Sequence, residues 1–257
     1  MMQIKILGAH NAASAATGFV TIVLDGIILV DAGTIVSALT FEEQKKIKAI
    51  LLTHGHYDHT RDVPAIGMSL AMQKSSVDVY VAEPARDVLM SCLVNDKIYM
   101  DFTQRPKENP ALRIHTVEPG KKETVEGYEI LPVPVKHSMP ATGFQITAPD
   151  GKKVFVTSDT GPGLEDAWKQ IKPDTLVTEV TTTNKEDEFA HKAGHLTPKL
   201  LQAELESFKK IHNYLPKVVL THLNPFEEKV IKEELKEVEK ALGIKITVAR
   251  EGMTVRV

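Results

Sequence analysis

Short apolar runs predict β-strands in the first third of the chain. Four such runs are separated by glycines at positions 8, 18, 26 and 33, and they read QIKIL, GFVTIVL, GIILV and IKAILLT. Glycine favours turns over regular structure, so these positions mark the ends of strands. Residues 62–74 and 84–103 instead have a helical pattern of apolar positions. We therefore expect four strands followed by two helices.

The remainder of the chain alternates bunches of strands with amphipathic helices. The expected strands read ALRIHTV, YEILPVPV, TGFQITA, KVFVTS, DTLVTEV and KVVLTHL. One helix follows Thr197, a suitable N-cap, and Pro198 at its first position. A later helix has an apolar stripe formed by Val230, Ile231, Leu235, Val238 and Leu242. This order predicts an α+β fold with two mixed sheets and helices on their outer faces.

Composition narrows the class of protein. The 257 residues contain no Ser- or Gly-rich linker, so we expect a single domain over residues 1–257. A net charge of −3 with no basic stripe argues against a nucleic-acid footprint. Cys92 is the only cysteine, so any metal must be held by nitrogen and oxygen, and a reducing compartment is expected. There is no long apolar run for a membrane span or a signal peptide, so we predict a cytoplasmic protein.

The segment THGHYDHT crowds potential metal ligands directly behind a strand. In an extended chain His54, His56 and Asp58 would share one face, and His59 could join them only if the chain turned there. Neutral imidazoles and a carboxylate form a ligand set that suits zinc, with manganese or iron as alternatives. The competing interpretation is a surface patch of histidines without a metal.

The same segment resembles the HxHxDH signature of the metallo-β-lactamase fold. Three further motifs follow in the family's order, each beyond an apolar strand: VKHSMPATGF with His137, VTSDTGPG with Asp159, and VVLTHLNP with His222. The resemblance extends from Leu7 to about Pro225 and implies a four-layer αββα sandwich with two mixed β-sheets.

The resemblance also implies a site for two divalent cations about 3.5–4 Å apart, most simply two zinc ions. The ligands implied for the first cation are His54, His56 and His137. Those implied for the second are Asp58, His59 and His222, with Asp159 between the two. Asp31, in LVDAG, matches a further family position that supports the site, although a turn aspartate would look the same in the sequence.

Two other residues point to a branch of the family that cleaves phosphodiesters. His195, in AGHLTPKLL, is similar to the HxT element of ribonuclease Z and of class II cyclic-nucleotide phosphodiesterases. Glu179, in TEV, resembles the acidic residue that orients this histidine. The free N–H groups of a helix that begins just after His195 would favour an anion such as phosphate. The alternatives are an exposed loop histidine and an ordinary carboxylate at a strand end.

The spacing of motifs separates these two branches. Ribonuclease Z typically has a long Gly- and Pro-rich arm that grips transfer RNA between the third histidine motif and the bridging aspartate. Between His137 and Asp159 this chain has room only for two strands and a turn. SDTGPG, GHLTP, THLNP and EGMTVRV look like the class II phosphodiesterases, whereas Tyr57 stands where that signature usually has leucine.

The resulting hypothesis is a dinuclear metal-dependent phosphodiesterase that hydrolyses a small cyclic nucleotide, such as 3′,5′-cyclic AMP, by attack of a metal-bridging hydroxide. Its expected catalytic residues are Asp58, Glu179 and His195, and a homodimer is expected by resemblance. The rivals are a ribonuclease Z-like RNA 3′-processing nuclease, a thioesterase or lactonase, a diiron redox protein and a non-enzymatic metal-binding module.

Two regions match no ligand motif. His10 lies in a loop after the first strand, where it could line the pocket. The segment 84–110 is interpreted as a helix packed on the sheet, with a lid or a dimer surface as alternatives. His115, His191 and His212 are expected to be structural or exposed.

Overall fold

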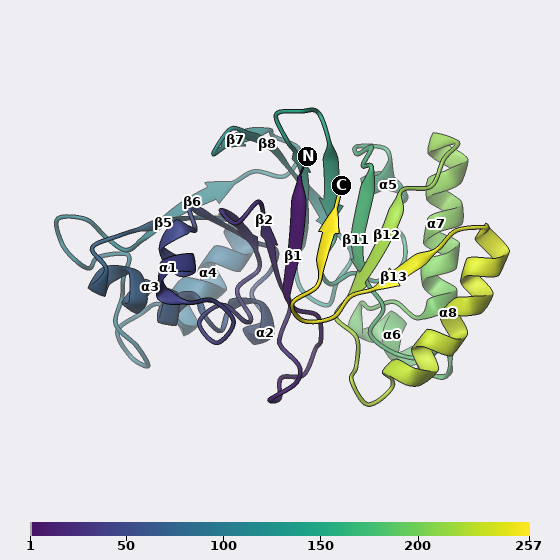
Figure 1. Ribbon diagram of the computed structural model, residues 1–257, viewed down its shortest axis with the longest axis horizontal. Helices are drawn as coiled ribbons and strands as arrows, with labels where there is room; N and C mark the ends of the chain where they lie inside the picture. Colours follow the sequence, from purple (N-terminus) through teal and green to yellow (C-terminus); the bar gives the residue numbers. More distant parts are fainter. Residues whose placement is uncertain (1) are drawn as a thin grey trace.

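The computed structural model describes residues 2–257 and consists of two seven-stranded β-sheets packed face to face (Figure 1). The first sheet contains, in spatial order, β14 (Thr254–Arg256), β1 (Gln3–Gly8), β2 (Thr21–Leu24), β3 (Ile28–Val30), β4 (Ala49–Leu52), β5 (Val77–Ala82) and β6 (Leu112–Val117). The second contains β13 (Ile246–Val248), β12 (Lys217–Thr221), β11 (Thr175–Glu179), β10 (Lys153–Val156), β9 (Ala141–Thr147), β8 (Tyr128–Val135) and β7 (Glu123–Val125).

Each sheet is half antiparallel and half parallel. In the first, β14, β1, β2 and β3 pair antiparallel, and β3 to β6 pair parallel. In the second, β7 to β10 pair antiparallel, and β10 to β13 pair parallel. The expectation of two mixed sheets is therefore confirmed.

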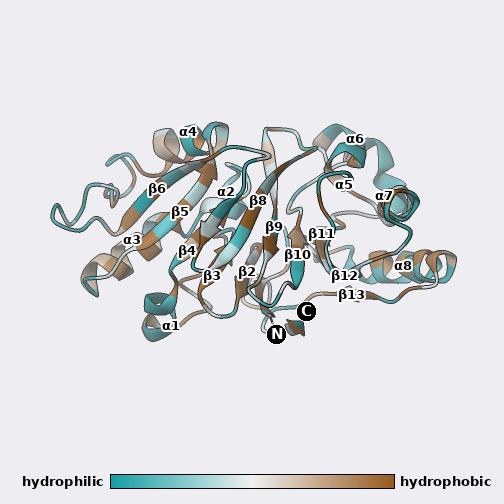
Figure 2. Ribbon diagram, turned by 90° about the horizontal axis from the view of Figure 1, so that it is seen from above, coloured by the Kyte–Doolittle hydropathy of each residue, from teal (hydrophilic) through white to brown (hydrophobic). Residues whose placement is uncertain are grey.

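The helices cover the outer faces of both sheets, which completes the expected four layers (Figures 1 and 2). The first sheet is covered by α1 (Phe41–Lys46), α3 (Val63–Met72) and α4 (Glu83–Cys92), and the second by α5 (Glu165–Trp168), α7 (Pro198–His212) and α8 (Glu228–Leu242). Shorter elements are α2 (Tyr57–Thr60), α6 (Asp187–Ala193) and a 3-10 turn, η1 (Asn184–Glu186). Among the helices of residues 2–257, none has the length and apolarity needed to cross a membrane.

Three apolar layers hold this arrangement together. One lies between the sheets and includes Ile22, Phe144 and Val219. Another lies under α3 and α4, and the third lies under α7 and α8, where Trp168 and Phe208 are fully buried. Because each sheet is covered on both faces, its central parallel strands, such as β4 and β11, are buried throughout, whereas β5 and β6 nearer the edge of the first sheet retain exposed or half-buried positions.

The predicted helix over residues 84–103 is wrong beyond its first half. Helix α4 ends at Cys92, and the chain then follows an irregular path to β6. Here the Asn95 side chain accepts from the Lys97 N–H at 3.1 Å, and Asp96, with φ of 61°, accepts from the Asp101 N–H at 2.9 Å. Such short polar side chains offer the backbone an alternative to the helix, which explains the early end.

The strand ends place the candidate site. The parallel strands of both sheets, together with β8, end at one edge of the sandwich. The loops that follow β4, β8, β10 and β12 carry His54, His137, Asp159 and His222, respectively. Segments far apart in the sequence therefore meet at this edge.

Candidate functional site

The turn after β4 brings four candidate ligands together. Strand β4 ends at Leu52, and helix α2 begins at Tyr57 behind His56 as its N-cap. The expected strand face through residue 58 is therefore wrong in detail, because Asp58 and His59 lie on a helical turn. That same turn is what allows His59 to face the other ligands.

The first cluster consists of His54, His56, His137 and Asp159, whose ligand atoms all lie within 4.8 Å of one another. The His56 Nδ1 atom is 3.0 Å from His54 Nε2 and 3.1 Å from His137 Nε2. The Asp159 Oδ2 atom is 3.7 Å from His54 Nε2 and 3.8 Å from His137 Nε2. Three imidazoles and one carboxylate thus point at a common centre.

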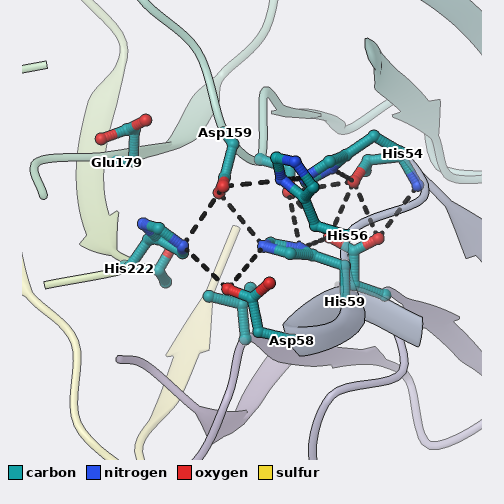
Figure 3. A network of polar contacts seen from close by, with 12 residues as sticks. His54, His56, Asp58, His59, Asp159, Glu179 and His222 are labelled. Carbon is teal, nitrogen blue, oxygen red and sulfur yellow. Dashed lines mark hydrogen bonds and ion pairs between the residues drawn. The ribbon is translucent and has the colours of Figure 1, made fainter. Parts of the chain in front are cut away.

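The second cluster consists of Asp58, His59, Asp159 and His222. His222 Nε2 lies 3.3 Å from Asp58 Oδ2 and 3.2 Å from Asp159 Oδ2. His59 Nε2 lies 3.5 Å from Asp58 Oδ2 and 3.3 Å from Asp159 Oδ1. Figure 3 shows these contacts as a closed ring in which two carboxylates alternate with two imidazoles. Asp159 belongs to both clusters, as the family resemblance implies.

Groups behind the clusters fix the direction of the imidazoles. Asp31, which is fully buried, has Oδ2 2.8 Å from His59 Nδ1, and it accepts from Ser158 Oγ at 2.7 Å. His137 Nδ1 lies 2.9 Å from the carbonyl oxygen of Gly194. A donor role for each Nδ1 leaves Nε2 with a lone pair directed at the cluster, as metal ligation requires.

Gly194 has a specific steric reason to be glycine. Its φ is +75°, and a Cβ atom there would lie 2.7 Å from the Cα of His137. Only glycine lets this backbone approach the histidine so closely.

Three residues at the site have left-handed backbone although they are not glycine. The φ angles of Asp31, Ser158 and His222 are 61°, 55° and 60°, and each residue closely follows a strand. This conformation is uncommon for residues with a Cβ and concentrates at functional sites. It turns each side chain out of the strand direction and into the site.

The donor set of the clusters fits metal cations. Within the described part of the chain, the buried atoms His59 Nε2 and Asp159 Oδ1 have no hydrogen-bond partner, although they lie 3.3 Å apart. Buried polar atoms without a partner are costly, and a cation between them would satisfy both. Nitrogen and oxygen ligands in two groups that share one carboxylate suit a dinuclear metal site.

The electrostatics of the clusters agree with this fit. Burial and the neighbouring His59 hold the pKa of His54 well below its usual value, so His54 is neutral, as a ligand must be. Burial opposes charge on Asp159, but His222 and His59 outweigh it and lower the pKa of this carboxyl. Burial likewise disfavours a charged His59, yet Asp159 and Asp31 raise its pKa well above the usual value, so a cation bound there would have to displace a proton from His59. The site therefore attracts positive charge.

Glu179 and His195 form a pair beside the second cluster. His195 Nδ1 lies 2.7 Å from Glu179 Oε1, and the His195 ring stacks on His222 with centroids 5.2 Å apart. Glu179 is fully buried at the end of β11. Burial would lower the pKa of His195, but the charge and hydrogen bond of Glu179 raise it to about 9. His195, three positions before the first residue of α7, is thus held beside the clusters by Glu179.

Several polar residues at the site went unnoticed in the sequence. Ser158 contacts Asp31, Thr53 also contacts Asp31, and Thr181 contacts both Glu179 and His222. Each follows an apolar strand by one or a few positions. Their position just after a strand was the only sequence feature that could have pointed to them. Serine and threonine are too common at strand ends for this feature to be informative.

The remaining histidines lie outside both clusters. His10 is buried, with Nδ1 2.7 Å from Glu251 Oε1. His115 Nε2 is 2.7 Å from Asp78 Oδ1, His191 Nε2 is 3.7 Å from Asp187 Oδ2, and His212 Nε2 is 2.8 Å from the Trp168 carbonyl oxygen. The contacts of His115, His191 and His212 agree with their expected structural or surface roles.

The segment 84–110 also lies outside the clusters. Ala85 and Leu89 of α4 are buried on the first sheet, as expected for a packed helix. Ile98, Tyr99 and Met100 are exposed.

Comparisons with known proteins agree with the fold. Residues 27–223 match the family model described as the beta-lactamase superfamily domain. Ribonuclease Z of Acaryochloris marina (strain MBIC 11017) is 25% identical over 117 residues, which cover 45% of this chain and 35% of that protein. The chain therefore matches only about a third of that relative's length.

Two further matches cover more of the chain. Ribonuclease Z of Prochlorococcus marinus (strain NATL2A) is 24% identical over 236 residues, which cover 70% of this chain and 71% of that protein. The structure of unliganded yeast PDE1 has a TM-score of 0.86 at 18% identity and covers 100% of this chain and 99% of that one. At such low identity the structural match speaks for the fold alone.

Proposed function

Because the chain belongs to the beta-lactamase superfamily and is a metal-dependent hydrolase, we propose that it is a dinuclear phosphodiesterase acting on a small cyclic nucleotide. Cyclic AMP is the first substrate to test. The observation that carries the proposal is the buried Glu179 carboxylate 2.7 Å from His195 Nδ1, beside the two clusters.

The two clusters would hold the cations. Asp159 would bridge them, with His54, His56 and His137 on one side and Asp58, His59 and His222 on the other. This nitrogen and oxygen set suits zinc, with manganese and iron as alternatives. When bound, such cations lower the pKa of a coordinated water and neutralise charge on a phosphate group.

His195 would act as the general acid. In the reaction a bond forms between the water oxygen and phosphorus, while the bond from phosphorus to the 3′-oxygen breaks. The departing oxygen needs a proton, and His195 can supply one from Nε2 because Glu179 holds Nδ1. Asp58, with 24% of its side chain exposed against 2% for Asp159, faces the open side of the site, where it would orient the attacking water.

Two features support a small substrate. The chain between His137 and Asp159 forms β9, a turn and β10, with no long arm to hold a folded RNA. The net charge of −3 gives no general attraction for the many phosphates of an RNA.

A ribonuclease Z-like nuclease is the second candidate, and the two matched ribonuclease Z proteins favour it. A panel of purified, metal-loaded protein against cyclic mononucleotides, cyclic dinucleotides, an aryl phosphodiester and precursor transfer RNA separates the two. We expect kcat/KM for a cyclic mononucleotide to exceed that for RNA at least tenfold. Faster cleavage of the RNA 3′ end would establish the nuclease instead.

A thioester and a lactone complete the panel. If the protein hydrolyses the thioester or the lactone, and if His195→Ala does so equally fast, then the Glu179–His195 pair has no part in the reaction and the proposal is overturned. The expected homodimer is tested by measuring the molar mass of the protein by light scattering after size-exclusion chromatography. The cytoplasmic location stays a prediction.

A further inference from the structure

Thr181 lies where the supports of His195 and His222 meet. It is buried two residues after Glu179, in the segment that follows β11. Its Oγ1 atom is 2.6 Å from Glu179 Oε2, 2.7 Å from His222 Nδ1 and 3.3 Å from His195 Nδ1. One hydroxyl therefore contacts the carboxylate and both histidines.

The number of hydrogens assigns the direction of these bonds. A hydroxyl has one hydrogen to donate, whereas an ionised carboxylate only accepts. The contact with Glu179 at 2.6 Å is the shortest and joins a charged acceptor, whereas the other acceptor in reach, the His222 carbonyl oxygen, lies at 3.2 Å, so Thr181 donates to Glu179. Its oxygen must then accept from His222 Nδ1–H, which leaves a lone pair on His222 Nε2 directed at the second cluster.

Glu179 holds the other histidine with the same carboxylate. Its Oε1 atom accepts from the Thr160 N–H at 3.0 Å and lies 2.7 Å from His195 Nδ1, which donates to it. Its Oε2 atom accepts from the Leu196 N–H at 3.2 Å as well as from Thr181. Both oxygens of the buried carboxylate already accept two hydrogen bonds each. The carboxylate therefore cannot rotate without disturbing both histidines.

We propose that Thr181 is a positioning residue that couples the second metal ligand, His222, to the acid pair Glu179–His195 through one hydrogen-bonded chain. This inference rests on the proposed metal centre. It adds that the orientation of the proton donor and the affinity for the second cation depend on one hydroxyl group. Loss of that hydroxyl should weaken both, although Thr181 itself touches neither the substrate nor a cation.

The test compares Thr181→Val, which removes the hydroxyl at nearly constant shape, with Thr181→Ser, which keeps it. Thr182→Val is the matched control, because Thr182 is equally buried and donates to Glu227 Oε2 at 2.7 Å, away from the clusters. Zinc affinity is measured for each of the two sites by competition with a chromophoric chelator. Outer-sphere partners of this kind typically change metal affinity 10–100-fold.

We expect Thr181→Val to weaken the second zinc 10–100-fold, to leave the first within about threefold, and to lower kcat with little change in KM. Thr181→Ser and Thr182→Val should stay within about threefold of the wild type at both sites. If Thr181→Val retains wild-type affinity for the second zinc, or if Ser fails to restore it, the coupling is wrong. Should Thr181→Val not fold, Thr181→Ala replaces it.

A second readout needs no metal. In the metal-free protein labelled with 15N-histidine, the Nδ1 atoms of His222 and of His195 should both carry a proton, and Thr181→Val should lower the fraction of His222 rings that have a proton on Nδ1. An unchanged protonation of His222 Nδ1 in Thr181→Val would overturn the hydrogen-bond assignment. The wild-type titration tests the metal centre itself, since fewer than two bound zinc ions would defeat the proposed function and this inference together.

Discussion

Asp31 Oδ2 lies 2.8 Å from His59 Nδ1, and both side chains are fully buried. Asp31 also accepts from the Thr53 N–H and from the Ser158 hydroxyl, so the carboxylate is fixed in place behind the histidine. The pair decides how His59 Nε2 meets the second cluster. The turn-aspartate interpretation of this position therefore misses its main contact.

Substitution of Asp31 by Asn should weaken metal binding more than it perturbs the fold. Asn keeps the shape of the side chain but removes the charge that favours a proton on His59 Nδ1. Loss of such a partner typically lowers metal affinity 10–100-fold. Chelator competition measures it, and Asp166→Asn, at an exposed carboxylate on α5, is the control. Equal affinities in the Asp31 variant and the wild type would contradict a role for this pair.

Replacement of His195 by Ala should lower kcat by about 10²–10⁴-fold, the usual contribution of a general acid. Metal content should not change, because His195 belongs to neither of the two proposed ligand sets. His191→Ala on the neighbouring helix α6 removes an exposed histidine and should keep wild-type activity. Steady-state kinetics and elemental analysis provide the two measurements. Full activity in the His195 variant would remove the proposed acid.

Removal of metal should destabilise the protein. Without a cation the clusters hold several imidazoles and carboxylates close together, and among residues 2–257 some of their buried polar atoms have no hydrogen-bond partner. At a free zinc concentration of 100 times Kd, binding stabilises the fold by about 2.7 kcal/mol per site. For a chain of this size that corresponds to roughly 5–10 °C in Tm for one site. Thermal unfolding with and without chelator measures the change, and calcium should not restore the loss because it prefers oxygen ligands. A Tm that is insensitive to chelator and zinc would speak against the centre.

Stability should depend on pH through Glu251 and His10, at a distance in sequence from the clusters. Burial opposes ionisation of Glu251, but hydrogen bonds from His10 and from the Gly18 backbone lower its pKa from 4.5 to about 2. Its contribution is therefore complete above pH 4.5 and is lost as pH falls towards 2. The hydrogen bond to Glu251, against burial and with help from Glu228, raises the pKa of His10 above 6.5. That contribution is complete below pH 6.5 and is lost as pH rises through the raised pKa.

Both contributions are present together between pH 4.5 and 6.5. Glu251→Gln should therefore lower the free energy of unfolding most in this window, by about 1–3 kcal/mol, with a smaller difference at pH 3 and at pH 9. Urea unfolding at several pH values measures it, with Glu237→Gln at an exposed position of α8 as the control. A difference that does not vary with pH would show that charge on this pair is unimportant.

Local patterns determined much of the fold and of the candidate site. The apolar runs predicted ten of the strands, and helix α7 begins where Thr197 and Pro198 predict it, with the Thr197 side chain accepting from the Leu200 N–H. The four ligands of HGHYDH are close in sequence, so one turn after a strand suffices to gather them. Periodicity, caps and short motifs act over a few residues, and such features can be read without the rest of the chain.

Tertiary structure decided what depends on distant partners. Strands β13 and β14 have three residues each and exist because they pair with β12 and β1, and the sequence pattern did not predict them. Strand β5, paired with β4 and β6, also went unpredicted, although its six residues VDVYVA alternate in the way expected of a strand. A short segment becomes a strand when a neighbouring strand satisfies its backbone, and that neighbour can lie anywhere in the sequence.

The inner supports of the site belong to the same category. The contacts of Asp31 with His59 and of Thr181 with His222 join loops that follow different strands, and the left-handed backbone of His222 is imposed by its surroundings. A threonine or an aspartate at a strand end carries no mark of the partner it will find. The sequence by itself determined which groups carry the chemistry, and the packing of the two sheets decided which atom of each group faces the site, because that direction is set by contacts between segments far apart in the chain.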